Sequence, residues 1–257
     1  MPDRSLTVAP SVDGFGPVAS EGRGRPRLRS DAEILELALR AFATQGFDAV
    51  SVRALNAALG LSHGTINQRF GSKERLYYAA VDHGFGPFLA EIEAHQAAEL
   101  AHLEEVDDLD LLRTLIHGFL LAARQRPELG RLMSQEGTES TDRLDHIVRT
   151  VIAPMVTGPK ALLDRLQGEG RIRPVTLRTL FFLATHGAET PFTLGALSQA
   201  FDAYDGPLDP EAHARTVTDL LMAGLVLPER ATQDDPLSGQ VTAGGSRRGA
   251  ARSRGRG

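Results

Sequence analysis

The chain contains no cysteine and no tryptophan, and aromatic residues make up only 5% of its 257 residues. The lack of cysteine excludes disulfides, thiolate nucleophiles and cysteine-based zinc sites, and it is typical of the reducing cytoplasm. No apolar run approaches the roughly 18 residues that span a bilayer, and the N-terminus lacks the apolar core of a signal peptide. These features predict a cytoplasmic protein without a membrane segment.

Signatures of catalysis are also lacking. The sequence contains no nucleophile elbow, phosphate loop, dinucleotide fingerprint or zinc protease motif, so we expect no catalytic residues and no cofactor. His95, Glu99 and His102 are spaced four and three apart and would share one helical face, an arrangement that suits a metal ligand set. Their segment is polar throughout, which favours an ordinary solvated face, and we therefore predict no metal site.

The residues that are abundant indicate a helical protein with a basic N-terminal part. Apolar residues make up 42% of the chain, and alanine and leucine are frequent, which predicts an all-α fold with a substantial core. The net charge is −5, yet residues 23–75 carry nine arginine or lysine residues against five acidic ones. A basic head on an acidic body is typical of a module that binds nucleic-acid phosphates.

The segment from Ser51 to Phe70 has the pattern of two short helices joined by a tight turn. Ser51 is a suitable N-cap, and Val52, Leu55, Ala58 and Leu59 would form an apolar stripe. Gly60 suits the left-handed turn that ends such a helix. Ser62 is expected to cap a second helix, whose Ile66 and Phe70 would pack on the first while the other side chains face outward. Such a pair is typical of a helix-turn-helix, which places its second helix in the major groove of DNA. The same pattern also occurs by chance in helical proteins, which is the alternative for this stretch alone.

The surrounding residues resemble the N-terminal domain of the tetracycline-repressor-like (TetR) family of bacterial regulators. The resemblance covers about residues 28–80, and the matching elements are Gly46-Phe47, Ser51-Val52-Arg53, Gly60-Leu61-Ser62, Gly64-Thr65-Ile66, Phe70 and Gly71-Ser72-Lys73-Glu74. It implies a three-helix DNA-binding head over residues 28–86, with the helix-turn-helix at 51–70, and a helical body for ligand binding and dimerisation over residues 87–227. Residues 1–27 are expected to form a disordered basic arm, and residues 228–257 a disordered basic tail.

Two positions depart from the family pattern. Asn56 replaces a small alanine that packs the two helices together, so its buried amide requires a hydrogen-bond partner. Asn67 replaces a tyrosine that contacts a phosphate. Twelve residues are predicted to contact the bases of DNA, its phosphates or both. They are Arg25, Arg27, Ser51, Arg53, Ser62, His63, Gly64, Thr65, Asn67, Gln68, Arg69 and Lys73.

The arginines on either side of the predicted domains allow two interpretations. Arg25 and Arg27 belong to a run of alternating arginines that would suit a narrow minor groove, and a plain solubilising tail is the alternative. The C-terminal arginines are interpreted as a solvated tail. Lys73 is expected at the start of the fourth helix, where its ammonium and the free backbone amides would hold a phosphate.

The fourth helix is predicted to kink or break near Gly86, because Pro87 removes one backbone hydrogen bond and clashes with the preceding turn. This break is a candidate hinge between head and body, and a fixed bend without a regulatory role is the alternative. Further interruptions are expected near Pro154 and at Gly158-Pro159. Two apolar helices near the C-terminus, at about 174–188 and 210–225, are expected to form a homodimer interface.

An effector site in the body is predicted from histidines and large apolar side chains, namely His117, Phe119, Met133, Met155, Phe182 and His186. The sequence thus predicts a homodimeric transcriptional regulator, most simply a repressor, that binds a palindromic double-stranded DNA operator and is released by a small molecule. The alternatives are a helical enzyme or small-molecule-binding protein with an incidental head, and a dimeric scaffold that acts through protein contacts.

Overall fold

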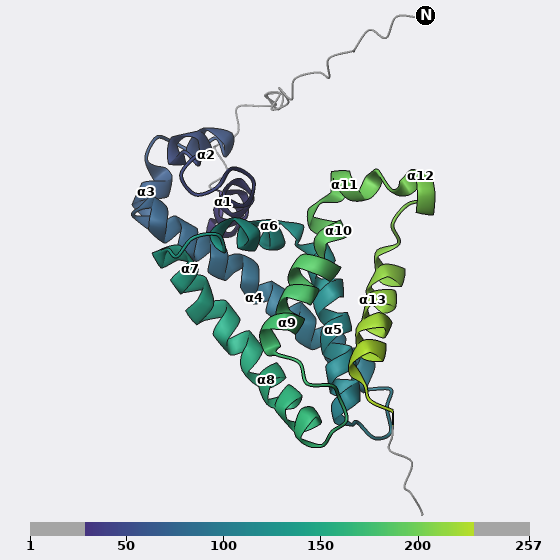
Figure 1. Cartoon of the computed structure of the whole chain (residues 1–257). Coiled ribbons are helices and arrows are strands. Elements are labelled where there is room, and N and C mark those ends of the chain that lie inside the picture. The colour runs from purple at the N-terminus through teal and green to yellow at the C-terminus, as the bar shows by residue number, and fades with distance from the viewer. Residues whose placement is uncertain (1–28, 229–257) are drawn as a thin grey trace, which may run out of the picture. The chain divides into compact units, whose positions relative to one another are not determined.

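The computed structural model describes residues 29–228, and the regular elements of this part of the chain are helices (Figure 1). Its only extended pairing is one isolated antiparallel bridge between Ile172 and Val226. The all-α prediction is therefore confirmed. Within residues 29–228 no helix combines the length and the apolar character that a bilayer crossing requires. The predicted basic arm, residues 1–27, and nearly all of the predicted tail, 228–257, lie outside the described residues.

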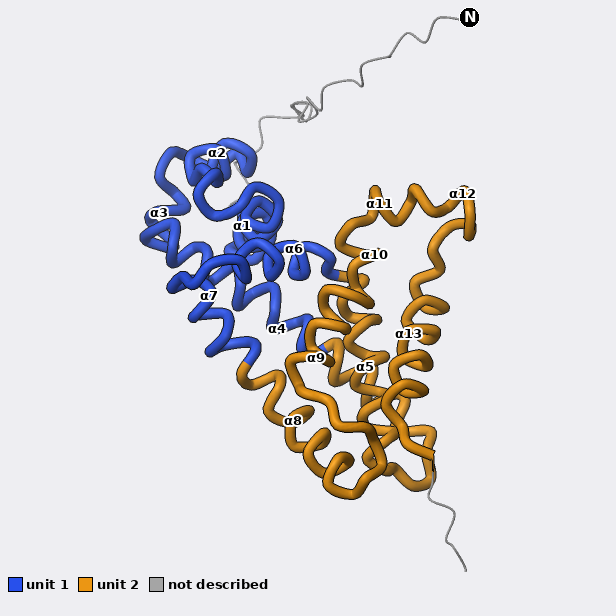
Figure 2. Tube along the Cα trace, in the orientation of Figure 1, with its two compact units in different colours: residues 1–90, 126–152 blue, residues 91–125, 153–257 orange. Residues whose placement is uncertain are grey.

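The described residues divide into two compact units (Figure 2). Unit 1 consists of residues 29–90 together with 126–152, and unit 2 of residues 91–125 together with 153–228. The division therefore differs from the expected separation at residue 86, because the segment 126–152 packs with the N-terminal head. Long-range packing of this kind leaves no local pattern in the sequence.

Unit 1 is built from five whole α-helices, a short π-helix and the first part of a sixth α-helix. The whole helices are α1 (Asp31–Gln45), α2 (Val52–Ala58), α3 (Thr65–Phe70), α6 (Pro127–Glu136), α7 (Asp142–Ile147) and η1 (Val148–Ile152). The partial helix is the N-terminal part of α4 (Lys73–Leu100).

Helix α1 begins and ends where its sequence signals place it. The Ser30 side chain accepts a hydrogen bond from the backbone N–H of Glu33, and the Glu33 carboxylate accepts one from the backbone N–H of Ser30, which completes a capping box. Gly46 ends the helix with a φ of 78°. The buried face of α1 carries Ile34, Ala38, Leu39, Phe42 and Ala43. Helix α1 therefore contributes five side chains to the core of unit 1.

Helix α6 packs on α1 within unit 1. Its Leu129 and Leu132 are buried, and the Gln135 side chain donates a hydrogen bond of 3.1 Å to the backbone carbonyl of Ala43. Gly84 of α4 lies beside both helices, since a Cβ at this position would come within 2.5 Å of Leu39 Cδ2 and 3.1 Å of Leu129 Cδ2. A side chain at this position would therefore have to displace the buried Leu39 side chain.

Helix α4 runs without a break from Lys73 to Leu100 and contains Pro87 in its interior. The predicted break near Gly86 is therefore wrong, whereas the kink, the other predicted outcome, stays a prediction. The region from Asp142 onward also differs from the prediction. Its irregular part is the π-helix η1, which ends just before Pro154, and Pro159 lies inside the continuous helix α8 (Ala153–Gly168).

Unit 2 contains the end of α4 and the remaining helices. They are α5 (Asp108–Gln125), α8, α9 (Leu177–Phe182), η2 (Leu183–Ala188), α10 (Thr190–Thr193), α11 (Gly195–Gln199), α12 (Asp202–Asp205) and α13 (Pro210–Leu225). Helix α5 packs against α13 and α8. Its Leu112, Ile116 and Leu120 join the buried core of this unit.

Candidate nucleic-acid interface

Helix α2 packs against α3, the helix that carries the candidate interface. Ser51 accepts a hydrogen bond from the backbone N–H of Ala54, so the predicted N-cap is confirmed. The buried residues of α2 are Leu55 and Asn56, whereas Ala58, expected in the stripe, is exposed. Arg53 is exposed on the first turn. The helix is only seven residues long, so packing rather than its own hydrogen bonds must stabilise it.

The turn between α2 and α3 uses two left-handed glycines. Gly60 has a φ of 65°, and the backbone N–H of Leu61 then bonds to the carbonyl of Asn56 at 2.8 Å, as a glycine-ended helix requires. Gly64 has a φ of 89° and occupies the N-cap position of α3. The prediction that Ser62 caps this helix is wrong, because its hydroxyl bonds to the Thr65 hydroxyl at 2.7 Å rather than to a backbone amide.

Asn56 provides the hydrogen bond to the start of α3 that Ser62 does not provide. Only 3% of this residue is exposed. Its side-chain oxygen accepts a hydrogen bond of 3.2 Å from the backbone N–H of Ile66, and its amide nitrogen donates one of 3.1 Å to the carbonyl of Val52. The expectation that the Asn56 amide has a partner is confirmed. One side chain therefore satisfies the start of α3 and fixes it to α2.

Helix α3 turns one apolar residue inward and a polar surface outward. Ile66 is buried, while Ser62, His63, Asn67 and Gln68 are exposed. Amide and imidazole groups both donate and accept hydrogen bonds, which suits the edges of bases in a major groove. Gly64 and Thr65 are half-buried at the start of the helix. This exposed surface is referred to below as the α3 surface.

Arg69 and Lys73 lie at the edge of the α3 surface and already have protein partners. The Arg69 guanidinium donates to the carbonyl of Arg29 at 2.6 Å and to Asp31 Oδ1 at 3.1 Å. The Lys73 ammonium donates to the carbonyl of Asp48 at 3.1 Å and lies 4.6 Å from the centre of the Phe47 ring. Arg69 therefore links α3 to the start of α1, a contact that sequence spacing did not indicate.

The start of α4 has the arrangement expected of a phosphate site. Gly71 ends α3 with a φ of 84°, and the Ser72 hydroxyl accepts a hydrogen bond from the backbone N–H of Arg75. The Lys73 side chain projects from the first residue of this 28-residue helix. Free amides and a nearby ammonium both attract an anion. Arg25 and Arg27, also predicted to contact DNA, lie outside the described residues.

The six residues predicted to bind an effector are not brought together in one unit. Met133 belongs to unit 1 and the other five to unit 2. The His117 Nδ1 lies 2.5 Å from Glu99 Oε1, and its buried Nε2 has no hydrogen-bond partner among the described residues. Phe182 is 52% exposed, with His186 beside it at a ring distance of 5.2 Å. Phe119 packs against the core of unit 2, and Met155 is half-buried in α8.

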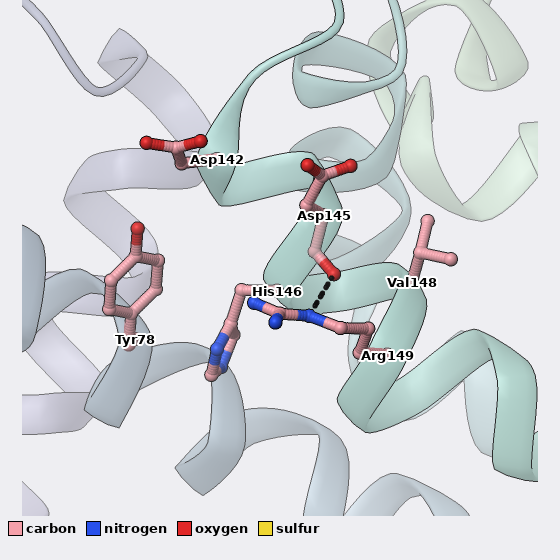
Figure 3. Close-up of a pocket in the computed structure, with 6 residues that line it drawn as sticks. All are labelled: Tyr78, Asp142, Asp145, His146, Val148 and Arg149. Carbon is pink, nitrogen blue, oxygen red and sulfur yellow. Dashed lines mark hydrogen bonds between the residues drawn. The ribbon is translucent and has the colours of Figure 1, made fainter.

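Unit 1 contains a polar pocket of about 490 Å³ that the sequence did not indicate (Figure 3). Its lining residues are Tyr78, Asp142, Asp145, His146, Val148 and Arg149. The imidazole of His146 stacks on Tyr78 at 4.5 Å and bonds to Asp82 at 2.8 Å.

Unit 2 has an apolar pocket of about 250 Å³ between Thr190 and Leu208. Neither pocket is lined by a residue predicted to bind an effector. The described residues also hold no group of three or more side chains suited to a metal ion.

The geometry of α2 and α3 agrees with the comparison with known families. The family model of bacterial regulatory proteins, tetR family, matches residues 34–80. Residues 34–80, referred to below as the TetR domain, are therefore similar to this family. The motif elements on which the predicted resemblance rests, from Gly46 to Glu74, all lie within the matched segment.

Two curated relatives resemble the TetR domain. They are the transcriptional repressors AcnR of Corynebacterium efficiens and Corynebacterium glutamicum, each 43% identical over 60 residues. The match covers 23% of this chain and 32% of each relative, so the chain spans about a third of the length of these repressors. The similarity therefore concerns the DNA-binding head alone.

Solved structures resemble the fold over a longer part of the chain. A Clostridium perfringens protein proposed to regulate fatty acid metabolism gives a TM-score of 0.57 at 18% identity, with 76% of this chain and 99% of that one covered. A Rhodococcus RHA1 regulatory protein of the tetR family gives 0.53 at 18% identity, with coverages of 78% and 100%. At such identities the likeness establishes the fold and leaves ligands and partners open.

Proposed function

We propose that the chain is a ligand-responsive transcriptional regulator that binds a palindromic operator as a homodimer. The observation that carries the proposal is the α3 surface, where Asn67 and Gln68 are exposed on a helix fixed by the buried Asn56 and Ile66. In this arrangement α3 enters the major groove, and Lys73 binds a flanking phosphate. Bacterial DNA lies in the cytoplasm, so the regulator acts there.

The homodimer is supported by apolar side chains that unit 2 leaves exposed. Phe182, Leu183 and Leu220 are 52%, 47% and 67% exposed, and they lie on the two helical segments predicted to form the interface. Burying such side chains against a second copy removes apolar surface from water. Two heads in one dimer would then read two half-sites related by a two-fold axis.

Repression and release by a small molecule complete the proposal. The curated relatives of the head are repressors, which supports repression here. The effector site would lie in unit 2 and draw on the predicted residues that belong to it, His117, Phe119, Met155, Phe182 and His186. Of these, His117 has a buried Nε2 without a hydrogen-bond partner in the described part of the chain, so this atom is available to a polar group of an effector.

The proposed function is tested by selecting fragments of DNA from the region around the chain's own gene with the purified full-length protein. The proposal predicts that selected fragments share an inverted repeat and that affinity falls steeply as salt rises, because phosphate contacts release counterions. Gln68→Ala should weaken binding to the selected sequence more than to random DNA. Absence of any selected sequence, or affinity that salt does not change, would support a helical enzyme or scaffold instead.

A further inference from the structure

The aromatic ring of Phe47 has two cationic side chains over it. The Lys73 ammonium lies 4.6 Å from the ring centre, and the guanidinium carbon of Arg143 lies 4.2 Å from it. Both distances fall within the roughly 6 Å over which a cation is attracted to an aromatic ring. Lys73 begins α4 and Arg143 lies in α7, so the ring joins two helices of unit 1 that are 70 positions apart in the sequence.

The Phe47 ring is itself held by aromatic neighbours. It stacks on Phe42 at a centroid distance of 5.8 Å and meets the edge of Tyr77 at 5.6 Å. Tyr77 and Phe42 are buried, with 0% and 1% of their surface exposed. The aromatic cluster therefore restrains the ring that the two cations contact.

Arg143 is fixed on its other side by a buried carboxylate. Its Nε donates to both carboxylate oxygens of Glu136 at 3.1 Å, and Glu136 is only 7% exposed. The Thr141 hydroxyl adds a longer contact of 3.5 Å to the same carboxylate. A buried carboxylate is costly without a cation, so the pair holds the guanidinium in one place against the ring.

The Lys73 ammonium uses only one of its N–H donors in the hydrogen bonds found among the described residues. An ammonium group has three N–H donors, and one of them bonds to the carbonyl of Asp48. Two donors remain for a phosphate, and the ring and the carbonyl together restrict where they point. A side chain that is restrained before binding loses less conformational freedom when it binds.

We propose that Arg143 is a positioning residue for DNA binding, which holds Phe47 and, through its ring, the Lys73 ammonium in the place where a DNA phosphate is bound. The inference rests on the proposed function, in which Lys73 contacts that phosphate. Arg143 itself has no part in the contact. Because Arg143 lies in α7, any change in the position of α7 within unit 1 is transmitted to Lys73.

The variant that tests this role has to remove Arg143 without leaving a buried charge. Arg143→Met alone would strand the Glu136 carboxylate and could unfold unit 1. The double variant E136Q/R143M removes both charges and keeps similar side-chain volumes. Arg149→Met is the matched control, because Arg149 is exposed in η1 and its guanidinium donates only to the nearby Asp145 carbonyl among the described residues.

The first readout is the affinity of the full-length chain for its selected operator DNA, measured for E136Q/R143M, K73A and the combination of the two. The proposal predicts that E136Q/R143M weakens binding by about three- to ten-fold, in the range of a cation–π contact. It also predicts that the slope of log affinity against log salt becomes less steep by about one, as for the loss of one phosphate contact. In the K73A background E136Q/R143M should have little further effect, and R149M should match the unmodified chain.

The second readout needs no DNA. The sequence contains two lysines, Lys73 and Lys160, and the exposed Lys160 serves as an internal reference. In E136Q/R143M the acetylation rate of Lys73 relative to that of Lys160, measured by mass spectrometry, should rise at least two-fold because the ammonium is less restrained. R143K, which keeps the ion pair with Glu136, should partly restore the normal rate.

The outcomes separate this inference from the function on which it rests. Unchanged DNA affinity in K73A would overturn the phosphate contact itself. A weakened K73A together with a fully active E136Q/R143M, or equal losses for E136Q/R143M with and without Lys73, would overturn the positioning role alone. An unchanged acetylation ratio would do the same.

Discussion

At the scale of single residues, the most consequential side chain in the TetR domain is Asn56. A buried polar residue at a helix contact would normally be unfavourable, yet Asn56 bonds to both Val52 and Ile66. The hydrogen bond to the backbone N–H of Ile66 replaces the side-chain cap that α3 lacks, since its N-cap is Gly64. The departure from the family pattern is therefore compensated inside the same helix pair.

Asn56→Ala is predicted to lower the free energy of unfolding by about 1 to 3 kcal/mol, because it leaves the Ile66 amide without a partner and removes buried contacts. Thermal unfolding followed by circular dichroism checks this. Asn67→Ala, on the exposed side of α3, is the control and should leave the melting temperature within about a degree. Equal melting temperatures for both variants would contradict the role given to Asn56.

Glu189 is predicted to make the stability of the chain depend on pH. Only 6% of this residue is exposed, and burial raises the pKa of its carboxyl from 4.5 to about 7. Folding therefore favours the protonated form, and stability is lost as pH rises from about 4.5 to about 7. Glu189→Gln should be more stable than the unmodified chain at pH 8 by about 2 to 3 kcal/mol and little different at pH 4.

Denaturant unfolding at pH 4, 6 and 8 measures this difference. Glu105→Gln, in an exposed loop of the same unit, is the matched control and should follow the unmodified chain at every pH. A Glu189→Gln variant with the same pH dependence as the unmodified chain would show that folding does not raise the pKa of the Glu189 carboxyl.

At the scale of elements, the sequence predicted those helix starts and turns that depend on neighbouring residues. The cap at Ser51 and the left-handed glycine at position 60 are both confirmed, because each depends on residues within one turn. Ser62 was wrongly predicted as a cap, since its hydroxyl has a nearer partner in Thr65. The break near Gly86 was also wrong, as α4 accommodates Pro87 within a continuous helix.

The two glycines of α4 before Pro87 are predicted to respond differently to alanine. A Cβ at Gly84 would meet Leu39 at 2.5 Å, whereas a Cβ at Gly86 meets nothing within 4 Å. Gly84→Ala should therefore destabilise the chain by about 1 to 3 kcal/mol through overpacking. Gly86→Ala should stabilise it by about 0.5 to 1 kcal/mol, since alanine favours a helix more than glycine does.

Chemical denaturation of the two variants measures both effects. Gly86→Ala also tests whether this part of α4 acts as a hinge, because it stiffens the helix without disturbing a neighbour. If the segment is a hinge, release from DNA by an effector should change in this variant. An unchanged response would leave Gly86 with no regulatory part.

At the scale of the whole molecule, the sequence indicated the fold class and the DNA-binding head but not how distant segments combine. Residues 126–152 join the head in unit 1 through contacts such as Gln135 with Ala43 and Arg143 with Phe47. Arg69 likewise bonds to residues near 30 rather than projecting from α3. Such pairs are far apart in the sequence and have no periodicity, so a single sequence does not reveal them.

The proposed dimer makes a prediction at this scale. Leu183→Glu and Leu220→Glu together should convert a dimer into a monomer, because a charge in an apolar interface is strongly unfavourable. Sedimentation should then give half the mass, and operator affinity should fall at least ten-fold since the two half-sites are no longer read together. Val106→Glu, at a residue that is 47% exposed in the loop after α4, is the control. A dimer that persists in the double variant would place the interface elsewhere.

The central claim is that the α3 surface reads DNA, and the most direct measurement is hydroxyl-radical footprinting of the full-length chain on the DNA that flanks its own gene. The account predicts two protected segments related by two-fold symmetry, with centres about one helical turn or a multiple of it apart. Gln68→Ala and Lys73→Ala should remove the protection, and Lys160→Ala should retain it. Absence of protection, or protection that survives both head substitutions, would contradict the account.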